Sequence, residues 1–314
     1  MLHVVLRRFL WFIPVFFIVT GITFITAHAL PGGPFDKEKT PPALVKQMEA
    51  IYGLDRPLPE QYLTWLSNVV RLRFGPSLAS RGRPVESFLL PGLAVSAQLG
   101  ALAMLFALLI GLPAGTLAAL KYDTWMDRGA TFIAILGVSI PNLALGPLLY
   151  WFFGLKLGWL PVAKWASLSD GLWPYLSHAL LPAITLGAGI SAIIARLTRA
   201  SLLQVMHEDY IRTAHAKGLA PRVVTTRHAL RNALIPVVTY LGPLAAAILT
   251  GSLVVEQIFA IPGMGRYFVS SISSRDYPML MAVVVIYSVL IVIANLIVDI
   301  LYAFLDPRIR GNDG

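Results

Sequence analysis

Residues Gln98–Leu120 read QLGALAMLFALLIGLPAGTLAAL and contain no charged side chain. A helix needs about 20 apolar residues to cross the hydrocarbon core of a bilayer, so this stretch predicts a membrane span. Five other stretches have the same character: Phe9–Ala29, Gly129–Gly154, Leu180–Leu203, Pro236–Val255 and Met279–Phe304. The sequence therefore predicts an all-α, polytopic membrane protein with six transmembrane helices.

The composition agrees with a membrane protein. Only 13% of the 314 residues are charged and 57% are hydrophobic, whereas a soluble protein carries about 25% charged residues. The net charge of +9 would suggest nucleic-acid binding in a soluble protein, but basic loops also set membrane topology. Cysteine is absent, which excludes disulfides, thiol nucleophiles and cysteine metal sites.

Lys and Arg residues in the short loops predict the orientation of the chain. They lie before the first span, between the second and third spans, and after the last, at Arg7, Arg8, Lys121, Arg128, Arg308 and Arg310. The loop 204–235 is the most basic, with Arg212, Lys217, Arg222, Arg227 and Arg231 against Glu208 and Asp209. An even number of spans places all of these on one side. Both termini and this loop are therefore predicted to be cytoplasmic.

The first span also has features of a secretory signal peptide. Arg7-Arg8 precede an apolar stretch that ends at Ala27-His28-Ala29, a small-x-small pattern typical of a cleavage site. Signal cores usually contain about 7–15 apolar residues, and this stretch is longer, which favours an uncleaved span. Cleavage is the alternative, and it would leave five spans with the termini on opposite sides.

The polar region after the first span is predicted to contain two short amphipathic helices. Apolar residues recur at helical spacing in two places, at Leu44, Met48, Ile51 and Tyr52 and at Tyr62, Trp65, Leu66 and Val69. Pro59 suits the first turn of the second helix. The alternative is a small cap without a function of its own. The expected division is residues 1–95 for the first span and this extracytoplasmic insertion, 96–305 for the main transmembrane domain, and 306–314 for a cytoplasmic tail.

Motifs of three enzyme classes are absent. A nucleotide-binding P-loop requires a Gly-Lys pair, and no glycine in this chain is followed by lysine. His207-Glu208 begins a metalloprotease pattern, but Ile211 stands where the second histidine would be. No serine lies in a Gly-x-Ser-x-Gly elbow. The chain is therefore expected to be non-catalytic, with no metal and no directly bound cofactor.

Three charged residues fall within or beside predicted spans. Arg196, Arg199 and Asp299 lie near the cytoplasmic ends of their helices, where a charged side chain can extend to water. We predict that they are interfacial anchors; the alternative is that they face a pathway or a partner.

Small residues and prolines mark particular places in the spans. Gly111 and Gly115, and likewise Gly187 and Ser191, are spaced four apart, which lets helix backbones approach closely. Close packing is the prediction, and a gate is the alternative. Pro141 and Pro147 are predicted to interrupt the third span.

The basic loop has a pattern beyond its charge. Leu203, Met206, Tyr210 and Ala214 form an apolar stripe that continues from the fourth span. Gly218 is a natural helix stop, and Pro221 suits the first position of a second short helix, 221–232. Positive-inside topology alone would explain the charge. The stripe and the turn instead favour docking onto a groove of a partner protein.

This loop closely resembles that of the permease subunits of binding-protein-dependent peptide importers, which belong to the ATP-binding-cassette (ABC) class. The resemblance is carried by YIRTAHAKGL at 210–219 and RHALRNALIP at 227–236. Ala214 and Gly218 match the general family signature, but Arg212-Thr213 and Leu230-Arg231 depart from it in the manner of the peptide-importer subtype. The rest of the chain adds PGGP at 31–34, FGPS at 74–77, LVVE at 253–256, IPGMG at 261–265, RDY at 275–277 and DPR at 306–308.

The resemblance implies a role for two sets of residues. The first is a coupling loop that docks on an ATPase subunit through Tyr210, Arg212, Thr213, Ala214, Lys217, Gly218, Leu219, His228, Leu230, Arg231 and Asn232. The second consists of candidates for an extracytoplasmic gate or for contact with the binding protein, namely Glu256, Pro262, Gly263 and Gly265.

The resemblance also implies a type I ABC importer permease fold, an inner-membrane location and a set of partners. These are a second permease, two ATPase subunits that use ATP and Mg, and an extracytoplasmic solute-binding protein; nucleic acid is not among them. The long loop after the first span is similar to that of the first permease of oligopeptide systems, so oligopeptides are the expected cargo. Dipeptides, nickel or another small solute are alternatives within the family. A stand-alone secondary carrier or channel is the second hypothesis, and a membrane hydrolase the third.

Overall fold

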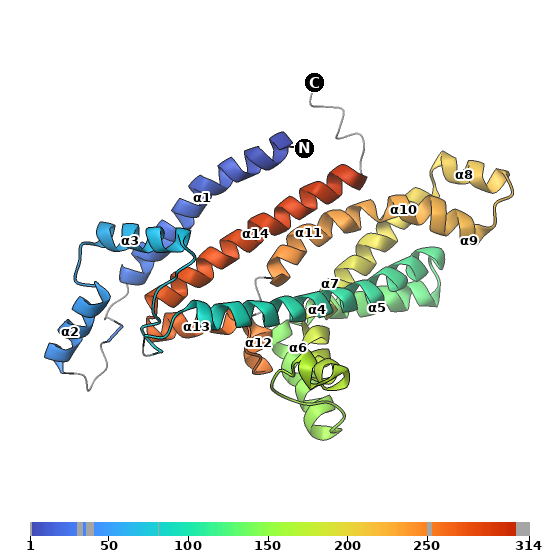
Figure 1. Cartoon of the computed structure of the whole chain (residues 1–314). Helices are drawn as coiled ribbons and strands as arrows, with labels where there is room; N and C mark the ends of the chain where they lie inside the picture. The colour runs from blue at the N-terminus through green and yellow to red at the C-terminus, as the bar shows by residue number, and fades with distance from the viewer. Residues whose placement is uncertain (1, 30–33, 36–40, 81, 250–252, 306–314) are drawn as a thin grey trace. The chain divides into compact units, whose positions relative to one another are not determined.

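The computed structural model describes residues 2–29, 34–35, 41–80, 82–249 and 253–305. In these residues β-structure is limited to an isolated bridge between Pro76 and Pro84, and the other regular structure is helical (Figure 1). The predicted all-α class is confirmed. The predicted tail 306–314 and most of the PGGP stretch lie outside the described residues, as do the side chains of Arg7, Arg8 and Asp299.

Four of the described helices are long and apolar enough to cross a membrane. They are α1 (Leu2–Ala29), α4 (Glu86–Leu120), α7 (Leu172–Met206) and α14 (Tyr277–Leu305). A fifth span results if α5 (Trp125–Ser139) is counted together with residues 142–156, which bend away from it by 103°. The remaining predicted span, Pro236–Val255, falls on α11 (Ile235–Leu249) and the start of α12 (Leu253–Ile258), and residues 250–252 between them lie outside the described residues. A count of six therefore stays a prediction.

The predicted third span is broken at Ile140 and Pro141. α6 (Asn142–Leu149) begins after Pro141, whose φ of −62° and ψ of 144° are not helical. Proline has no N–H to donate and pushes the preceding residue into an extended conformation, as found for Ile140 at φ −87° and ψ 114°. α6 contains Pro147 and continues into the π-helix η1 (Tyr150–Lys156). The predicted interruption is confirmed at Pro141.

The chain divides into two compact units, of which the first comprises residues 1–95 and 263–292. It holds α1, α2 (Pro42–Tyr52), α3 (Leu58–Val70), α13 (Met264–Ser274) and one end each of α4 and α14. The two short helices predicted after the first span are confirmed, and each has a proline in its first turn. Because residues 263–292 also belong to this unit, it is larger than the predicted 1–95 segment. The predicted three-part division remains a prediction.

A buried carboxylate holds two distant segments of the first unit together. Asp276 is 2% exposed and accepts a hydrogen bond from the hydroxyl of Ser77, which is itself fully buried. It also accepts the backbone N–H of Leu78 at 3.1 Å and of Met279 at 3.3 Å. Charge-assisted bonds of this kind are the strong ones. The FGPS and RDY stretches, far apart in the sequence, therefore meet at this carboxylate.

The second unit comprises residues 96–262 and 293–314 and is built around α7. α4 approaches α7 closely at glycines. A Cβ added at Gly111 would lie 2.6 Å from the carbonyl oxygen of Ser191, and one at Gly115 would lie 2.3 Å from that of Ala195. A Cβ at Gly187 would lie 2.6 Å from the carbonyl oxygen of Ala103. The predicted close packing is confirmed, because only glycine leaves room for the facing backbone.

Gly115→Ala is expected to destabilise the protein by about 1–3 kcal/mol, the usual cost of overpacking. The new methyl group would meet backbone, which cannot rotate away. Gly129→Ala in α5 is the matched control, since no atom lies within 4 Å of its added Cβ. The Gly129→Ala variant should be more stable than the wild type by about 0.5–1 kcal/mol, because alanine has the better helix propensity. The free energy of unfolding in a detergent titration measures both effects. Equal changes in the two variants would contradict the close approach of α4 and α7 at Gly115.

Candidate functional site

The predicted coupling loop forms the extension of α7 in the second unit (Figure 1). α7 ends at Met206, and α8 (Asp209–Ala216) follows it. After a turn come α9 (Pro221–Val223), the π-helix η3 (Val224–Ala229) and α10 (Leu230–Ala233), which together form the predicted second helix. Pro221 occupies the first turn, as expected.

The turn after α8 depends on Gly218. Its φ is +77°, in the left-handed region that favours glycine. Its N–H donates to the carbonyl of His215 at 2.9 Å, and the N–H of Leu219 donates to that of Ala214 at 3.4 Å. These bonds satisfy carbonyls that the end of a helix leaves unpaired. The predicted glycine stop between two helices is confirmed.

The apolar stripe packs mainly inside the loop. Ala214 is 6% exposed and Ile211 is 1% exposed. They form a cluster with Leu202, Val224 and the buried alanines of η3 and α10, and Leu203 and Met206 pack against it. The loop therefore covers most of the stripe itself and leaves Tyr210 as its exposed member, and docking of the loop onto a partner's groove stays a prediction. The sequence pattern missed Ile211 and Val224, which hold the two helices of the loop together.

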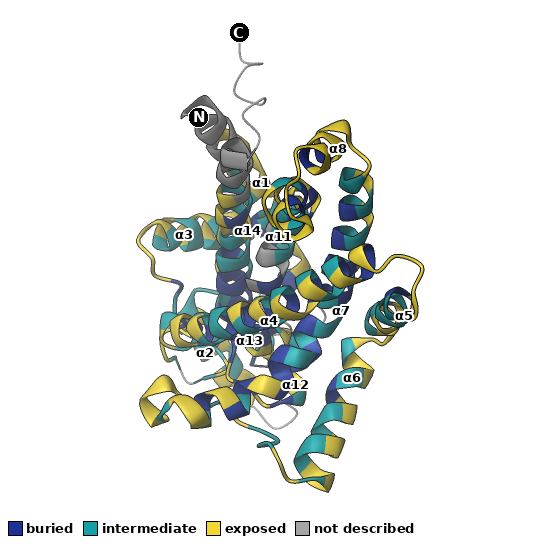
Figure 2. Ribbon diagram, turned by 90° about the vertical axis from the view of Figure 1, so that its right-hand side faces the viewer, coloured by how far each residue is buried: buried dark blue, intermediate teal, exposed yellow. Residues whose placement is uncertain are grey.

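The outward face of the loop is largely exposed (Figure 2). It carries basic residues and a few apolar side chains. Tyr210 is 41% exposed and Leu219 is 38% exposed. The Tyr210 hydroxyl accepts a hydrogen bond from the side-chain amide of Asn232 at 2.8 Å, which joins α8 to α10. Of the predicted coupling residues, Ala214 is buried and His228 and Leu230 are half-buried. The others are exposed: Tyr210, Arg212, Thr213, Lys217, Gly218, Leu219, Arg231 and Asn232.

The positive charge of this face remains open to solvent. Arg212 lies 3.7 Å from Asp209, and the two side chains are 73% and 97% exposed. Such exposed pairs contribute about 0–1 kcal/mol to stability, and this one neutralises little of the positive potential of the face. Arg222 and Arg227 add further exposed charge from α9 and η3. The face can therefore attract an acidic protein surface.

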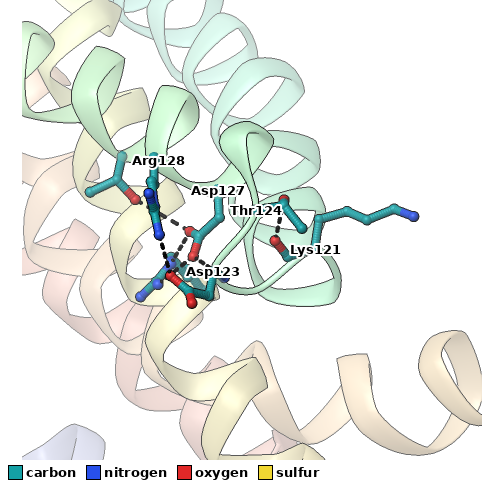
Figure 3. Close-up of polar contacts among 7 residues, drawn as sticks. Lys121, Asp123, Thr124, Asp127 and Arg128 are labelled. Carbon is teal, nitrogen blue, oxygen red and sulfur yellow. Dashed lines mark hydrogen bonds and ion pairs between the residues drawn. The ribbon is translucent and has the colours of Figure 1, made fainter.

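A partly buried ion pair between Asp127 and Arg199 joins α5 to α7 near this loop. Figure 3 shows Asp127 among the polar residues at the start of α5 and in the turn before it. The guanidinium of Arg199 donates through Nε and Nη2 to the two carboxylate oxygens of Asp127, at 2.6 Å and 2.8 Å. Asp127 is 3% exposed and also accepts the backbone N–H of Asp123 at 3.0 Å. Arg199 was predicted to be an interfacial anchor. Its specific partner, Asp127, was missed by sequence reasoning because the two residues are 72 positions apart. The interfacial role of Arg199 stays a prediction.

The position of this pair connects the membrane helices with the loop. Arg199 lies on α7 one turn before Leu202, which is fully buried in the apolar cluster of the loop. Asp127 lies in the first turn of α5, and its bond to Asp123 fixes the turn between α4 and α5. The apolar cluster, the ion pair and this bond thus form a continuous series of contacts from the loop through α7 to the start of α5.

Arg196, the other predicted anchor on α7, has an exposed side chain. It lines a cavity of about 390 Å³ together with Arg199 and small residues of α4 and α5. An exposed position is compatible with the predicted interfacial role. Both arginines therefore border a space between α4, α5 and α7.

The candidate gate residues are mostly buried. Glu256 on α12 is fully buried and accepts a hydrogen bond from the hydroxyl of Ser96 at 2.7 Å. Pro262, also in the second unit, is exposed. Gly263 and Gly265 belong to the first unit and are buried. Only Pro262 is thus accessible to a partner, and sequence reasoning missed Ser96, the partner of Glu256.

Two family models match the sequence and together cover most of it. The family described as "Binding-protein-dependent transport system inner membrane component" matches residues 111–311. The family described as "Binding-prot-dependent transport system membrane comp, N-term" matches residues 1–83. The glycine packing, the Asp127–Arg199 pair and the loop all lie in the region of the first model.

Curated relatives match over nearly their whole length. The dipeptide transport system permease protein DppB of Bacillus subtilis (strain 168) is 45% identical, over 99% of this chain and 98% of the relative. The glutathione transport system permease protein GsiC of Escherichia coli (strain K12) is 42% identical, over 99% of each. The oligopeptide transport system permease protein OppB of Haemophilus influenzae is 39% identical, over 99% of this chain and 100% of the relative.

A solved structure shares the fold. A chain of the MetNI methionine ABC transporter, in an inward-facing conformation, matches with a TM-score of 0.58 and 18% sequence identity. The match covers 70% of this chain and 96% of that one. At this identity the likeness establishes the type I ABC importer permease fold and nothing finer.

Proposed function

The chain belongs to the family of binding-protein-dependent transport system inner membrane components, and from this premise we propose that it forms half of the translocation pathway of an oligopeptide importer. It is a multi-pass permease subunit of an ABC-type peptide importer, as its relatives at 39–45% identity are. Oligopeptides are the proposed cargo. Dipeptides are the specific alternative, because the relative at 45% identity is named for dipeptide transport.

Coupling to the ATPase subunit is proposed to occur through the outward face of α8 and its turn. The observation that carries this proposal is an exposed basic surface whose shape is fixed by Gly218 and by the bond between Asn232 and Tyr210. Arg212 and Lys217 would supply attraction to an acidic rim, and Tyr210 and Leu219 would supply apolar contact. Ala214 would contribute from inside the loop by keeping α8 in place.

The proposed assembly contains this chain, a second homologous permease, two ATPase subunits that use ATP and Mg, and an extracytoplasmic solute-binding protein. Both termini and the α8 loop are proposed to be cytoplasmic, because their excess of Lys and Arg follows the positive-inside rule. The helices α2 and α3 would then lie on the extracytoplasmic side. Glu256 and Pro262 are proposed to act near the extracytoplasmic gate, Glu256 through its buried bond to Ser96. Gly263 and Gly265, in the first unit, are proposed to serve the extracytoplasmic gate or contact with the binding protein.

The proposed mechanism is conformational and involves no covalent chemistry by this chain. ATP binding by the partner would favour one of two arrangements of the permease pair, and ATP hydrolysis would favour the other. A coupling element of this kind must be stiff enough to carry a displacement. The cluster around Leu202, the Asp127–Arg199 pair and the glycine contacts with α4 provide such stiffness along α7.

Reconstitution of the chain tests this function. The full assembly in proteoliposomes, with its binding protein outside, should accumulate a labelled pentapeptide only when ATP is enclosed. Competition by unlabelled dipeptides and pentapeptides would then assign the cargo length. Vesicles with this chain alone should show no uptake. Flux through the lone chain driven by an ion gradient would establish the secondary-carrier hypothesis instead.

A further inference from the structure

A cavity of about 310 Å³ lies within the first unit, between the end of α1, the two short helices α2 and α3, and the start of α14. Its walls are partly aromatic, with Phe24, Trp65, Phe74 and Tyr277. Its volume is at the small end of the range for ligand pockets, about 300–1,000 Å³. It is far larger than a single water molecule needs, about 30 Å³.

Two buried nitrogen atoms of residues that line this cavity have no hydrogen-bond partner among the described residues. They are Nε2 of His28 and Nε1 of Trp65. Buried polar atoms are nearly always paired, and each exception calls for an explanation. Both side chains pack against other rings: the centroid of the His28 ring lies 4.1 Å from that of Phe24 and 4.5 Å from that of Tyr277, and the Trp65 ring stacks on Tyr62 at 5.9 Å. A ligand in the cavity would explain these two unpaired atoms, because it could form the hydrogen bonds that they lack.

The chemistry of the two nitrogens is complementary. Nδ1 of His28 lies 2.8 Å from the carbonyl oxygen of Phe24. A carbonyl only accepts, so Nδ1 donates here, and in the tautomer that carries its single proton on Nδ1 the other nitrogen, Nε2, is an acceptor. The indole Nε1–H of Trp65 can only donate. One acceptor and one donor match the N–H and the C=O of an amide group.

A third group at the cavity is cationic. Arg56, in the turn between α2 and α3, lines the cavity and is exposed. No ion pair to Arg56 occurs within the described part of the chain. The turn is held in shape by Gln61, whose side-chain amide donates to the carbonyls of Leu54 at 3.0 Å and Arg56 at 2.8 Å. Arg56 can therefore offer a guanidinium to a carboxylate at the mouth of the cavity.

We propose that this cavity binds the carboxyl-terminal end of a short peptide. Trp65 and His28 would hold an amide group, Arg56 the terminal carboxylate, and the aromatic walls a side chain. The proposal rests on the proposed function, which supplies peptides on the side where α2 and α3 lie. The site is distinct from the α8 loop and would receive peptide outside the coupling machinery.

Equilibrium binding of two peptides tests the site. The assembly of both permeases and the ATPases is placed in nanodiscs without the binding protein, and the dissociation constants for tritiated Ala-Leu and its C-terminal amide are measured. The wild type should bind the free acid more tightly. Trp65→Phe removes the N–H donor and one ring of the indole while it keeps an aromatic wall, and it should weaken both ligands about threefold to tenfold. Arg56→Gln should weaken the acid about tenfold or more and remove its advantage over the amide.

Trp159→Phe is the matched control, because Trp159 is 68% exposed and belongs to the second unit. It should leave both dissociation constants unchanged. Absence of peptide binding to the wild type, or equal binding by wild type and Trp65→Phe, would overturn the proposal. A lipid that co-purifies with the wild type and is lost in Trp65→Phe would also overturn it and assign the cavity to lipid. ATP-driven peptide uptake by the wild type, measured alongside, separates a failure of this site from a failure of the proposed function.

Discussion

Gly218→Val is expected to lower ATP-driven peptide uptake about tenfold or more, while the chain still inserts into the membrane. Gly218 has a φ of +77°, and a β-branched side chain in the left-handed region costs about 1–3 kcal/mol. Destabilising the docking-competent turn by about 1.4 kcal/mol lowers its population about tenfold. Uptake and peptide-stimulated ATPase activity of reconstituted assemblies measure the effect.

Gly218→Asn is the matched control for the backbone. No atom lies within 4 Å of a Cβ added at this position, so a larger side chain meets no steric obstacle and only the φ angle matters. Asparagine adopts the left-handed conformation more readily than other non-glycine residues. It should therefore retain most of the activity. If valine and asparagine reduce uptake equally, the docking surface itself excludes side chains, and the strain explanation fails.

Asp127→Asn is expected to destabilise the permease by about 3 kcal/mol and to reduce uptake with it. Removing one charge of a buried pair leaves the other without compensation, which typically costs about 3–5 kcal/mol. The lower end applies because the side chain of Arg199 is 28% exposed and can reach some water. The free energy of unfolding in a detergent titration and the ATPase activity of the assembly give the two readouts.

Asp123→Asn is the control for this pair. Asp123 bonds to Arg128 at 2.9 Å, but both side chains are more than 70% exposed, at 73% and 75%. An exposed pair contributes about 0–1 kcal/mol. Asp123 also has a φ of +59°, which asparagine tolerates, so the backbone should not change. A similar loss of stability in both variants would show that the burial of Asp127 has no special role.

The structure also changes what a substitution at Ala214 would report. The sequence pattern placed Ala214 on a stripe facing a partner, so Ala214→Arg would have tested docking directly. Because Ala214 is 6% exposed and packs in the cluster with Ile211 and Val224, arginine there would first disrupt the loop itself. Arg212→Glu and Lys217→Glu, at exposed positions, are the appropriate probes of the partner surface.

The sequence by itself determined the features that depend on local chemistry. Long apolar stretches predicted helices that can cross a membrane, Pro141 predicted the break in the third, and Gly218 predicted the stop of α8. Each rests on a property of one residue or one helix: hydrophobic length, a missing N–H, or a left-handed φ. The peptide-permease motifs likewise occur in contiguous runs, so the family could be recognised without a fold.

Only the tertiary structure decided which side chains meet and which faces stay exposed. Asp127 meets Arg199, Ser77 meets Asp276 and Ser96 meets Glu256, across 72, 199 and 160 positions. Nothing in the local periodicity of a helix encodes such pairs, because periodicity reports which residues share a face and not what covers that face. The same limit explains the α8 stripe. Its apolar spacing correctly predicted a buried face, and only the packing of η3 and α10 against it revealed that the loop buries this face itself.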